Sequence, residues 1–240
     1  MPALPVVFPR LNESIFGSAH RHQYYGLHYY VQSKDRHIRH LIPAPEYYNF
    51  AFNAIADDRY SLALVNARLN ATMTAIQDQW KHTRETMPRT GQPSFSVSQY
   101  VYQLKAEVAA GLFFARGLLD VFATLSHFLY GPRSRCFSSF ADVLKHISEK
   151  RSIEPNDPVM HDYAESHMQW FWSLRDFRDF VTHHSSLRVD FYEKEGRFDT
   201  YLQGVQTPQE LIGATIAGID TFLEFADKHF APRFAARATA

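Results

Sequence analysis

Cysteine, net charge and long apolar runs are scarce in this sequence of 240 residues. The single cysteine, Cys136, excludes an intrachain disulfide framework and a cysteine-based zinc site, and it agrees with a reducing compartment. Twenty-five basic residues balance 25 acidic ones, so bulk charge gives the chain no means of coating nucleic acid or membranes. These absences favour a globular protein, which we expect to be cytoplasmic.

No segment has the pattern of a membrane span or a signal peptide. The first eleven residues contain prolines at positions 2, 5 and 9 and lack the basic start and apolar run of a signal peptide. The longest apolar stretch, residues 108–125, is interrupted by Arg116 and Asp120, which is typical of a buried helix. We therefore expect no membrane contact.

The sequence does contain enough apolar and aromatic residues for a large core. Hydrophobic residues make up 45% of the chain and aromatic residues 15%, which excludes disorder for most of it. No internal repeat and no linker rich in Gly, Ser or Pro marks a domain boundary. We expect a partly extended N-terminal arm over residues 1–45 and one helical domain over residues 46–240.

Helical periodicity dominates the chain after this arm. Apolar residues recur at every third or fourth position until just before Pro88, at Leu62, Val65, Leu69, Met73, Ile76 and Trp80. A second stripe comprises Val97, Val101, Leu104, Val108, Leu112, Leu119 and Phe122. Ser96 and Gln99 form a capping-box pattern at its start. Gly111 and Gly117 each cost a helix about 1 kcal/mol relative to alanine, so we expect close helix approach there.

Helix-capping residues and a change in hydrophobic period predict the remaining helices and strands. A short helix is expected over residues 140–149, and Asp157-Pro158 opens a long helix that runs to about residue 184. The hydrophobic period then changes to two over residues 187–202, as in a β-hairpin. Thr207-Pro208-Gln209-Glu210 begins the last helix. The sequence thus predicts a mainly all-α fold, an up-and-down four-helix bundle with a short extra helix and an inserted β-hairpin.

The long helix predicted to end near residue 184 has the most informative sequence. On a wheel of about 100° per residue, its core stripe comprises Tyr163, His167, Trp170, Leu174, Phe177 and Val181. The opposite side mixes apolar and ionisable residues: Met168, Trp172, Arg175, Asp176, Asp179 and His183. A solvated face does not need Met168 or Trp172, so we expect both to be exposed contacts of a protein interface beside a polar site.

Charged residues at the end of this helix have the chemistry to cleave RNA without a metal. Asp179 lies four residues from both Arg175 and His183, so its carboxylate can pair with the arginine and fix the imidazole tautomer. Neutral His183 could take the proton from a ribose 2′-hydroxyl while Arg178 holds the phosphate, which would leave a cyclic phosphate. The alternative is an ordinary ion-paired helix end, with His183 and His184 placed against the C-terminal dipole.

The residues Arg178-Asp179-Phe180-Val181-Thr182-His183 resemble the signature of HEPN domains (higher eukaryote and prokaryote nucleotide-binding). That signature is an arginine, then Asn, Asp or His, three variable residues and a histidine. HEPN domains are helical bundles with this motif near the end of a late long helix, and many are metal-independent ribonucleases that act as dimers. The resemblance implies that Arg178 and His183 are catalytic, that Asp179 supports them, and that Met168 and Trp172 are dimer contacts.

The resemblance leaves different functions open. The chain is either a homodimeric HEPN-like ribonuclease of a bacterial toxin–antitoxin or defence system, or a catalytically inactive HEPN-like module that binds a nucleotide or a protein. The first predicts an RNA substrate, with an antitoxin or another protein as partner. A structural subunit of a larger assembly is a third interpretation. HEPN toxins that are silenced by nucleotide addition carry a tyrosine two residues after the histidine, whereas Ser185 stands there in this sequence.

Other charged groups extend the candidate site without predicting a metal. Arg175, His184 and Arg116 are candidate binding residues, although Arg116 could instead form a structural pair with Asp120. The histidine groups match no recognised ligand pattern, so we expect no metal and no other cofactor; they are His20 with His22, His37 with His40, and His183 with His184. Residues 34–40 form either a basic surface for an RNA backbone or a solvated loop.

Overall fold

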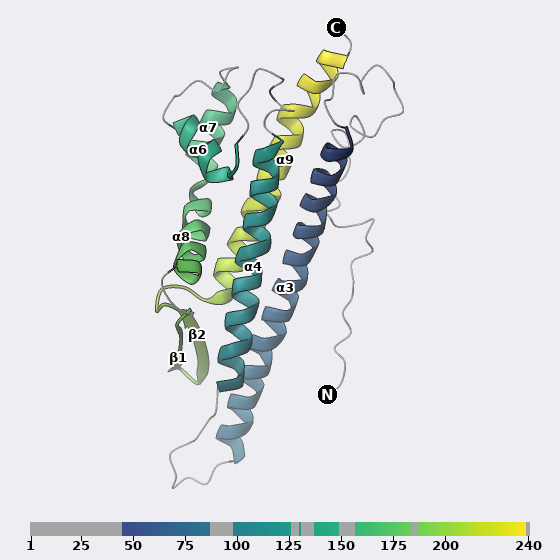
Figure 1. Ribbon diagram of the computed structural model, residues 1–240. Helices are drawn as coiled ribbons and strands as arrows, with labels where there is room; N and C mark the ends of the chain where they lie inside the picture. Colours follow the sequence, from purple (N-terminus) through teal and green to yellow (C-terminus); the bar gives the residue numbers. More distant parts are fainter. Residues whose placement is uncertain are drawn as a thin grey trace. The chain divides into compact units, whose positions relative to one another are not determined.

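The computed structural model describes residues 45–86, 98–125, 130, 137–148, 157–183 and 187–238. Within these ranges it contains six α-helices and two strands (Figure 1). In chain order they are α3 (Pro45–Thr86), α4 (Ser98–Thr124), α6 (Phe140–Ser148), α7 (Pro158–His167), α8 (Gln169–His183), β1 (Val189–Lys194), β2 (Arg197–Leu202) and α9 (Pro208–Ala238). The predicted mainly α-helical fold with an inserted β-hairpin is confirmed.

Several predictions concern residues that lie outside these ranges. They include the N-terminal arm up to residue 44, with its histidine and basic groups, and the Ser96 cap with Val97. Among the helices that are described, none combines the length and apolar character needed to cross a membrane.

Most residues of the predicted apolar stripes of α3 and α4 are buried. All six stripe residues of α3 are buried, and so are five of the seven in α4, namely Leu104, Val108, Leu112, Leu119 and Phe122. Val101 is half-buried. Because burial of each such side chain stabilises the fold by roughly 1.5–3 kcal/mol, these stripes account for why the two segments are helical.

A break at Met168 divides the long helix that was predicted over residues 157–184. The predicted Asp157 cap is confirmed, since its carboxylate accepts from the Met160 N–H at 3.2 Å. Met168 ends α7 with φ −102° and ψ 16°, and its N–H donates to the Ala164 carbonyl at 3.3 Å. A wheel drawn for one continuous helix therefore assigned wrong faces around the break. Met168 is only 1% exposed, so the prediction of an exposed interface contact there was wrong, whereas His167, predicted to be in the core, is exposed.

The chain divides into two compact units, which we describe separately. Unit 1 contains the described residues of Met1–Tyr60, Gly117–Met168 and Gly218–Ala240. Unit 2 contains those of Ser61–Arg116 and Gln169–Ala217.

Unit 1 has an aromatic core. The Phe222 ring packs edge-on against Phe122 and Phe140, with centroids 4.8 and 5.0 Å away, and Tyr163 stacks on Phe225 at 3.8 Å. Such pairs add about 0.5–1.5 kcal/mol each to the effect of burial. They hold α4, α6, α7 and α9 together within this unit.

Two side-chain pairs, one arginine–aspartate and one histidine–aspartate, border the core of unit 1. Arg59 makes a two-pronged contact with Asp220, with Nε–Oδ1 at 2.6 Å and Nη2–Oδ2 at 2.7 Å. His229 Nε2 lies 2.6 Å from Asp157 Oδ2, and both side chains are less than a tenth exposed. The same Asp157 carboxylate caps α7, so this pair links the start of α7 to α9.

In unit 2, α3 and α4 run antiparallel, side by side (Figure 1). Tyr100 donates to the Gln79 amide oxygen at 2.6 Å, and Gln103 donates to the Thr72 hydroxyl at 2.7 Å. A Cβ on Gly111 would lie 2.7 Å from the Ile212 Cδ1 atom. The close approach of a neighbouring helix predicted at this glycine is therefore confirmed.

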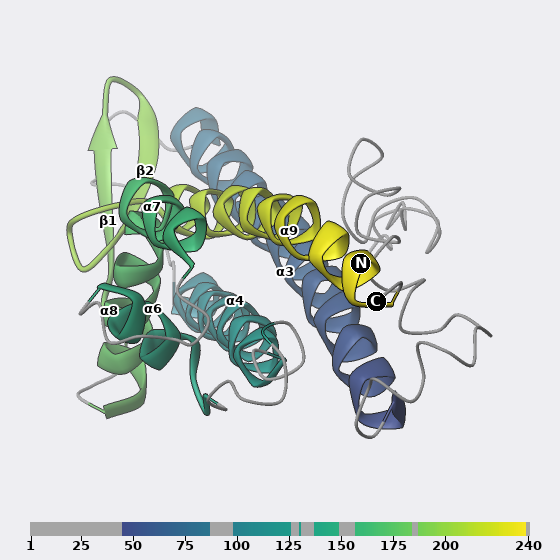
Figure 2. The same ribbon diagram turned by 90° about the horizontal axis from the view of Figure 1, so that it is seen from above.

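The hairpin of unit 2 pairs β1 and β2 antiparallel, and seen from above the two strands lie next to each other (Figure 2). Its register starts at Lys194↔Arg197, on either side of a turn in which Glu195 and Gly196 both have positive φ. This is the two-residue turn that suits the twist of a hairpin. After β2, the predicted capping box begins α9: the Thr207 N–H donates to Glu210 Oε2 at 2.8 Å, and the Glu210 N–H donates to Thr207 Oγ1 at 3.1 Å.

Candidate active site on α8

The predicted motif lies in the second half of α8, within unit 2. The first half of this helix is anchored by Phe171 and Leu174, which are fully buried. From Arg175 onward the described side chains are partly or fully exposed. The helix thus fixes its first turns in the core and presents its charged end at the surface.

Asp179 lies between two arginines, which we call the α8 cluster (Arg175, Arg178 and Asp179). Arg178 Nη1 lies 2.5 Å from Asp179 Oδ1, and Arg175 Nε lies 3.5 Å from Asp179 Oδ2. The pairing of Arg175 with Asp179, predicted from their spacing, is confirmed. All three side chains are about one-third exposed, so the cluster is in contact with solvent and carries one net positive charge.

An aromatic ring supports the cluster from the preceding turn. The Arg175 guanidinium carbon lies 5.6 Å from the Trp172 ring centroid, within the range of a cation–π contact. Trp172 also meets Phe171 edge-on at 5.3 Å and is half-buried. Arg175 is therefore held between the indole ring and the Asp179 carboxylate, while the role of Trp172 as a dimer contact stays a prediction.

The two histidines of the predicted site fall at the limit of the described residues. His183 is the last residue of α8, and its side chain lies outside them, as does all of His184. Four residues separate Asp179 from His183 in a continuous helix, which places both on one face. The hydrogen bond between their side chains stays a prediction.

Arg116 approaches α8 from α4 in the same unit. Its guanidinium carbon lies 5.5 Å from the Phe171 ring centroid, and its Nε and Nη1 atoms are shielded from solvent. Asp120, its predicted partner, accepts a hydrogen bond from the Phe140 N–H at 2.8 Å. Since Phe171 belongs to the buried side of α8, Arg116 is directed at the core side of the helix. Its two predicted roles, structural pair and phosphate contact, stay predictions.

The α8 cluster has the groups needed to bind an anion. Arg178 uses one N–H on Asp179, and a guanidinium has five N–H donors in all, so donors remain for a phosphate. Asp179 orients Arg178 and also competes with an incoming anion. Within the described ranges, no three His, Cys, Asp or Glu side chains gather in a way that could hold a metal ion.

Sequence reasoning missed a second polar region in unit 2. A cavity of about 410 Å³ is bordered by α3, β2 and the start of α9. Its one sequence signal is a polar line on α3 beside the apolar stripe, in which Asn70, Thr74, Gln77 and Lys81 follow one another at three or four positions.

Comparison of the chain with protein-family models, with curated proteins and with solved structures gives no match in any of the three. The resemblance to HEPN domains therefore rests on six residues of α8 and on the helical fold around them.

Proposed function

We propose that this protein is a HEPN-like, metal-independent endoribonuclease that acts as a homodimer in a bacterial toxin–antitoxin or defence system. The observation that carries the proposal is the α8 cluster: a partly exposed Arg178 oriented by Asp179, one turn before the end of the helix. An exposed arginine fixed by a carboxylate has little freedom to lose when it binds a phosphate, which favours tight and oriented binding.

In the proposed reaction, His183 takes the proton from a ribose 2′-hydroxyl, and the 2′ oxygen attacks the neighbouring phosphorus. The bond from phosphorus to the 5′ oxygen breaks, and the protonated imidazole supplies the proton that the leaving oxygen takes up. The products are a 2′,3′-cyclic phosphate and a 5′-hydroxyl. Arg178 offsets the negative charge that develops on the phosphoryl oxygens, and Asp179 keeps the guanidinium in place.

A catalytically inactive HEPN-like module that binds a nucleotide or a protein is the second candidate. The short contact between Arg178 and Asp179 favours it, because an arginine engaged by a carboxylate binds a phosphate only by sharing or exchanging that partner. The same cluster would then serve for binding alone.

The test is cleavage of end-labelled RNA in excess EDTA, with the products resolved on a gel. Wild-type protein is compared with Arg178→Ala and His183→Ala, and with the matched controls Arg197→Ala and His82→Ala, whose side chains are exposed on β2 and on α3. We expect cyclic-phosphate ends from the wild type and both controls, and a loss of at least about a hundredfold in rate for the two motif variants.

Two outcomes would contradict the ribonuclease proposal. Equal cleavage by the motif variants would assign the activity elsewhere or to a contaminant. If no RNA is cut but RNA or a nucleotide still binds, and binding weakens in Arg178→Ala alone, the binding module is the better function.

A further inference from the structure

Within unit 2, α4 contacts three other helices on three of its sides. Gln103 donates to a threonine hydroxyl of α3 at 2.7 Å, and a Cβ on Gly111 would lie 2.7 Å from an isoleucine of α9. The Arg116 guanidinium carbon lies 5.5 Å from the Phe171 ring centroid of α8. At about 100° per residue, these contacts leave an arc of about 140° between Arg116 and Gln103, which is the fourth side of the helix.

The fourth side of α4 is apolar. Four of its residues share an arc of about 60°, and we call them the α4 seam: Tyr102, Ala106, Ala109 and Phe113. Tyr102 is 75% exposed and Phe113 is 70% exposed. Between residues 98 and 115 this arc holds no charged side chain, although exposed helix faces of globular proteins are typically charged or polar.

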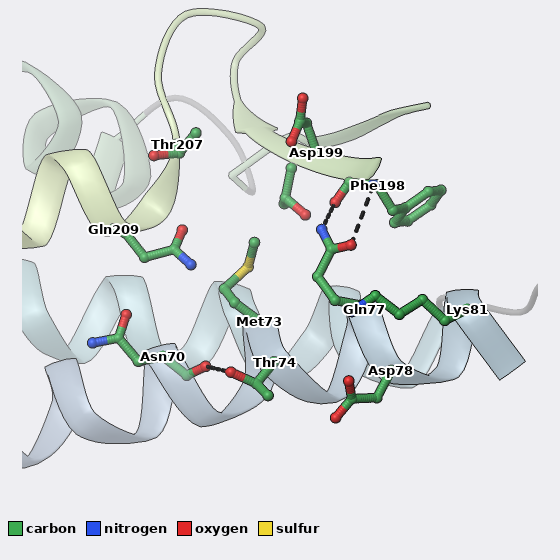
Figure 3. A pocket seen from close by; sticks show the side chains of 11 residues that line it. Asn70, Met73, Thr74, Gln77, Asp78, Lys81, Phe198, Asp199, Thr207 and Gln209 are labelled. Carbon is green, nitrogen blue, oxygen red and sulfur yellow. Dashed lines mark hydrogen bonds between the residues drawn. The ribbon is translucent and has the colours of Figure 1, made fainter. Parts of the chain in front are cut away.

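The exposed side of α3 in the same unit has the opposite composition. Where α3 borders the polar cavity, its exposed residues are Asn70, Thr74, Asp78 and Lys81 (Figure 3). Such side chains are well solvated, so this side of α3 needs no partner. The α4 seam instead holds two large rings in water, and an apolar stripe of this kind indicates a contact surface.

The seam has the same pattern in both directions along the helix. Its residues follow one another at spacings of four, three and four, with a large ring at each end and alanine at the two inner positions. A two-fold axis between identical subunits requires a patch that is complementary to itself. In an antiparallel pair of such helices, Tyr102 of each subunit lies opposite Phe113 of the other, and Ala106 lies opposite Ala109.

We infer that the α4 seam binds a second copy of this chain, with the two α4 helices antiparallel about a two-fold axis. The inner alanines let the helix axes approach to about 8–10 Å. The two pairs of rings lie about 16 Å apart along the helices, one at each end of the contact. Opposed helix dipoles favour this arrangement over a parallel one.

The size of the seam indicates a weak, reversible dimer. An aromatic side chain buries about 150–250 Å² when it is enclosed, so the exposed parts of Tyr102 and Phe113 contribute about 200–400 Å² per subunit. Stable interfaces bury about 800 Å² per partner, and transient ones less than about 600 Å². We therefore expect a Kd between about 1 and 100 μM.

This interface differs from the dimer contact that the HEPN resemblance implies, because it lies on α4 and uses no residue of α8. One of the two contacts implied on α8, Met168, is 1% exposed and so cannot meet a second subunit. The inference rests on the pattern and exposure of α4 and on no step of RNA cleavage.

The test is sedimentation equilibrium of the full-length protein between about 1 and 300 μM. We expect the wild type to form a dimer, and Tyr102→Lys and Phe113→Glu each to weaken association at least about tenfold. The two-fold axis repeats each substitution, so either one removes both pairs of rings. The matched controls are Tyr192→Lys and Val159→Glu, at apolar side chains that are 50% and 51% exposed outside the seam, and they should leave Kd unchanged.

A mixture of the two seam variants tests the antiparallel arrangement. In an antiparallel pair of the mixed chains, the introduced lysine faces the introduced glutamate at one end, while the native Phe113 and Tyr102 meet at the other. The mixture should therefore associate more tightly than either variant alone. A parallel pair of the mixed chains would keep no pair of rings.

The inference is overturned if the wild type is monomeric throughout, or if seam variants with unaltered circular dichroism spectra associate as the wild type does. It is also overturned if the controls weaken association as much, or if the mixture associates no better than its components. A protein that dimerises through the seam but cuts no RNA contradicts only the proposed function. A protein that cuts RNA while its seam variants still dimerise contradicts only this inference.

Discussion

Unit 1 and α8 each hold an aspartate against a nitrogen-bearing side chain, in opposite surroundings. In unit 1, His229 and Asp157 lie 2.6 Å apart, with side chains 8% and 4% exposed. On α8, Arg178 and Asp179 lie 2.5 Å apart, with side chains 36% and 33% exposed. Distance alone would rank the two pairs together, and a histidine held by an aspartate would be the more familiar catalytic arrangement.

Burial separates their roles. The enclosed pair has no access for a substrate, and removing one partner leaves the other without compensation in a low-dielectric environment. The exposed pair contributes about 0–1 kcal/mol to stability and remains open to a ligand. We therefore assign the pair in unit 1 to the fold and the pair on α8 to the candidate site, and the variants below test that division.

Asp157→Ala should have the largest effect on stability. The substitution leaves the buried His229 without its carboxylate and removes the cap of α7, so the free energy of unfolding should fall by about 3–5 kcal/mol. Urea denaturation followed by circular dichroism measures it. Asp162→Ala, an exposed position on the same helix, is the control and should change stability by less than about 0.5 kcal/mol. If Asp157→Ala lowered the free energy of unfolding by less than about 1 kcal/mol, the buried pair would contribute no more to stability than an exposed pair does.

Arg59→Met should have an intermediate effect. Arg59 is 8% exposed and its two-pronged contact is lost, but Asp220 keeps 29% of its side chain in solvent and can be hydrated. We expect a loss of about 2–3 kcal/mol in the same urea experiment, because the partner left behind is only partly desolvated. Arg197→Met, at an exposed position of the hairpin, is the control and should leave the urea midpoint of unfolding unchanged. A loss as large as that of Asp157→Ala would mean that partial exposure does not relieve an unpaired carboxylate here.

Much of the fold follows from local sequence patterns. The stripe from Leu62 to Trp80, the Thr207–Glu210 capping box and the hairpin all depend on neighbours within a few residues, and all are found in the structure. The pairing of Arg175 with Asp179 follows equally from one helical turn. These features need no knowledge of what packs against them.

The features that the sequence did not reveal depend on residues far apart in the chain. No glycine or proline marks the break at Met168, where the side chain is buried and the helix phase changes. The polar cavity of unit 2 brings α3 together with β2 and the start of α9, where Gln77 of α3 pairs with the Phe198 backbone of β2. A sequence gives the polar line on α3 but not which strand lies against it.

Asp58 is a partly buried carboxylate in unit 1, intermediate in exposure between the buried Asp157 and an exposed carboxylate. Burial, and after it the nearby Asp57 charge, raises the pKa of Asp58 from 3.8 to about 6. Because the folded state holds this proton more tightly than the unfolded state, stability should fall as the pH rises from about 4 to about 6 and then level off. At pH 7, Asp58→Asn should be more stable than the wild type by roughly 1 kcal/mol, a value reduced for solvent screening.

Urea midpoints between pH 4 and pH 7 measure this effect, with Asp162→Asn as the exposed control. The wild type and the control should lose stability together across this range, and Asp58→Asn should lose less. An equal slope for all three proteins would show that Asp58 ionises as it does in the unfolded chain.

Arg178→Ala should have the smallest effect on stability, and it completes the comparison. The pair with Asp179 is exposed and salt-screened, so its loss should change the free energy of unfolding by less than about 1 kcal/mol in urea and leave the circular dichroism spectrum unaltered. Asp179→Asn should behave in the same way, because Arg178 and Arg175 both remain hydrated. If either variant lost more than about 2 kcal/mol, the α8 cluster would be part of the fold, as the buried pair in unit 1 is. A small loss together with the expected fall in RNA cleavage would show that the exposed pair is kept for chemistry, since the fold does not need it.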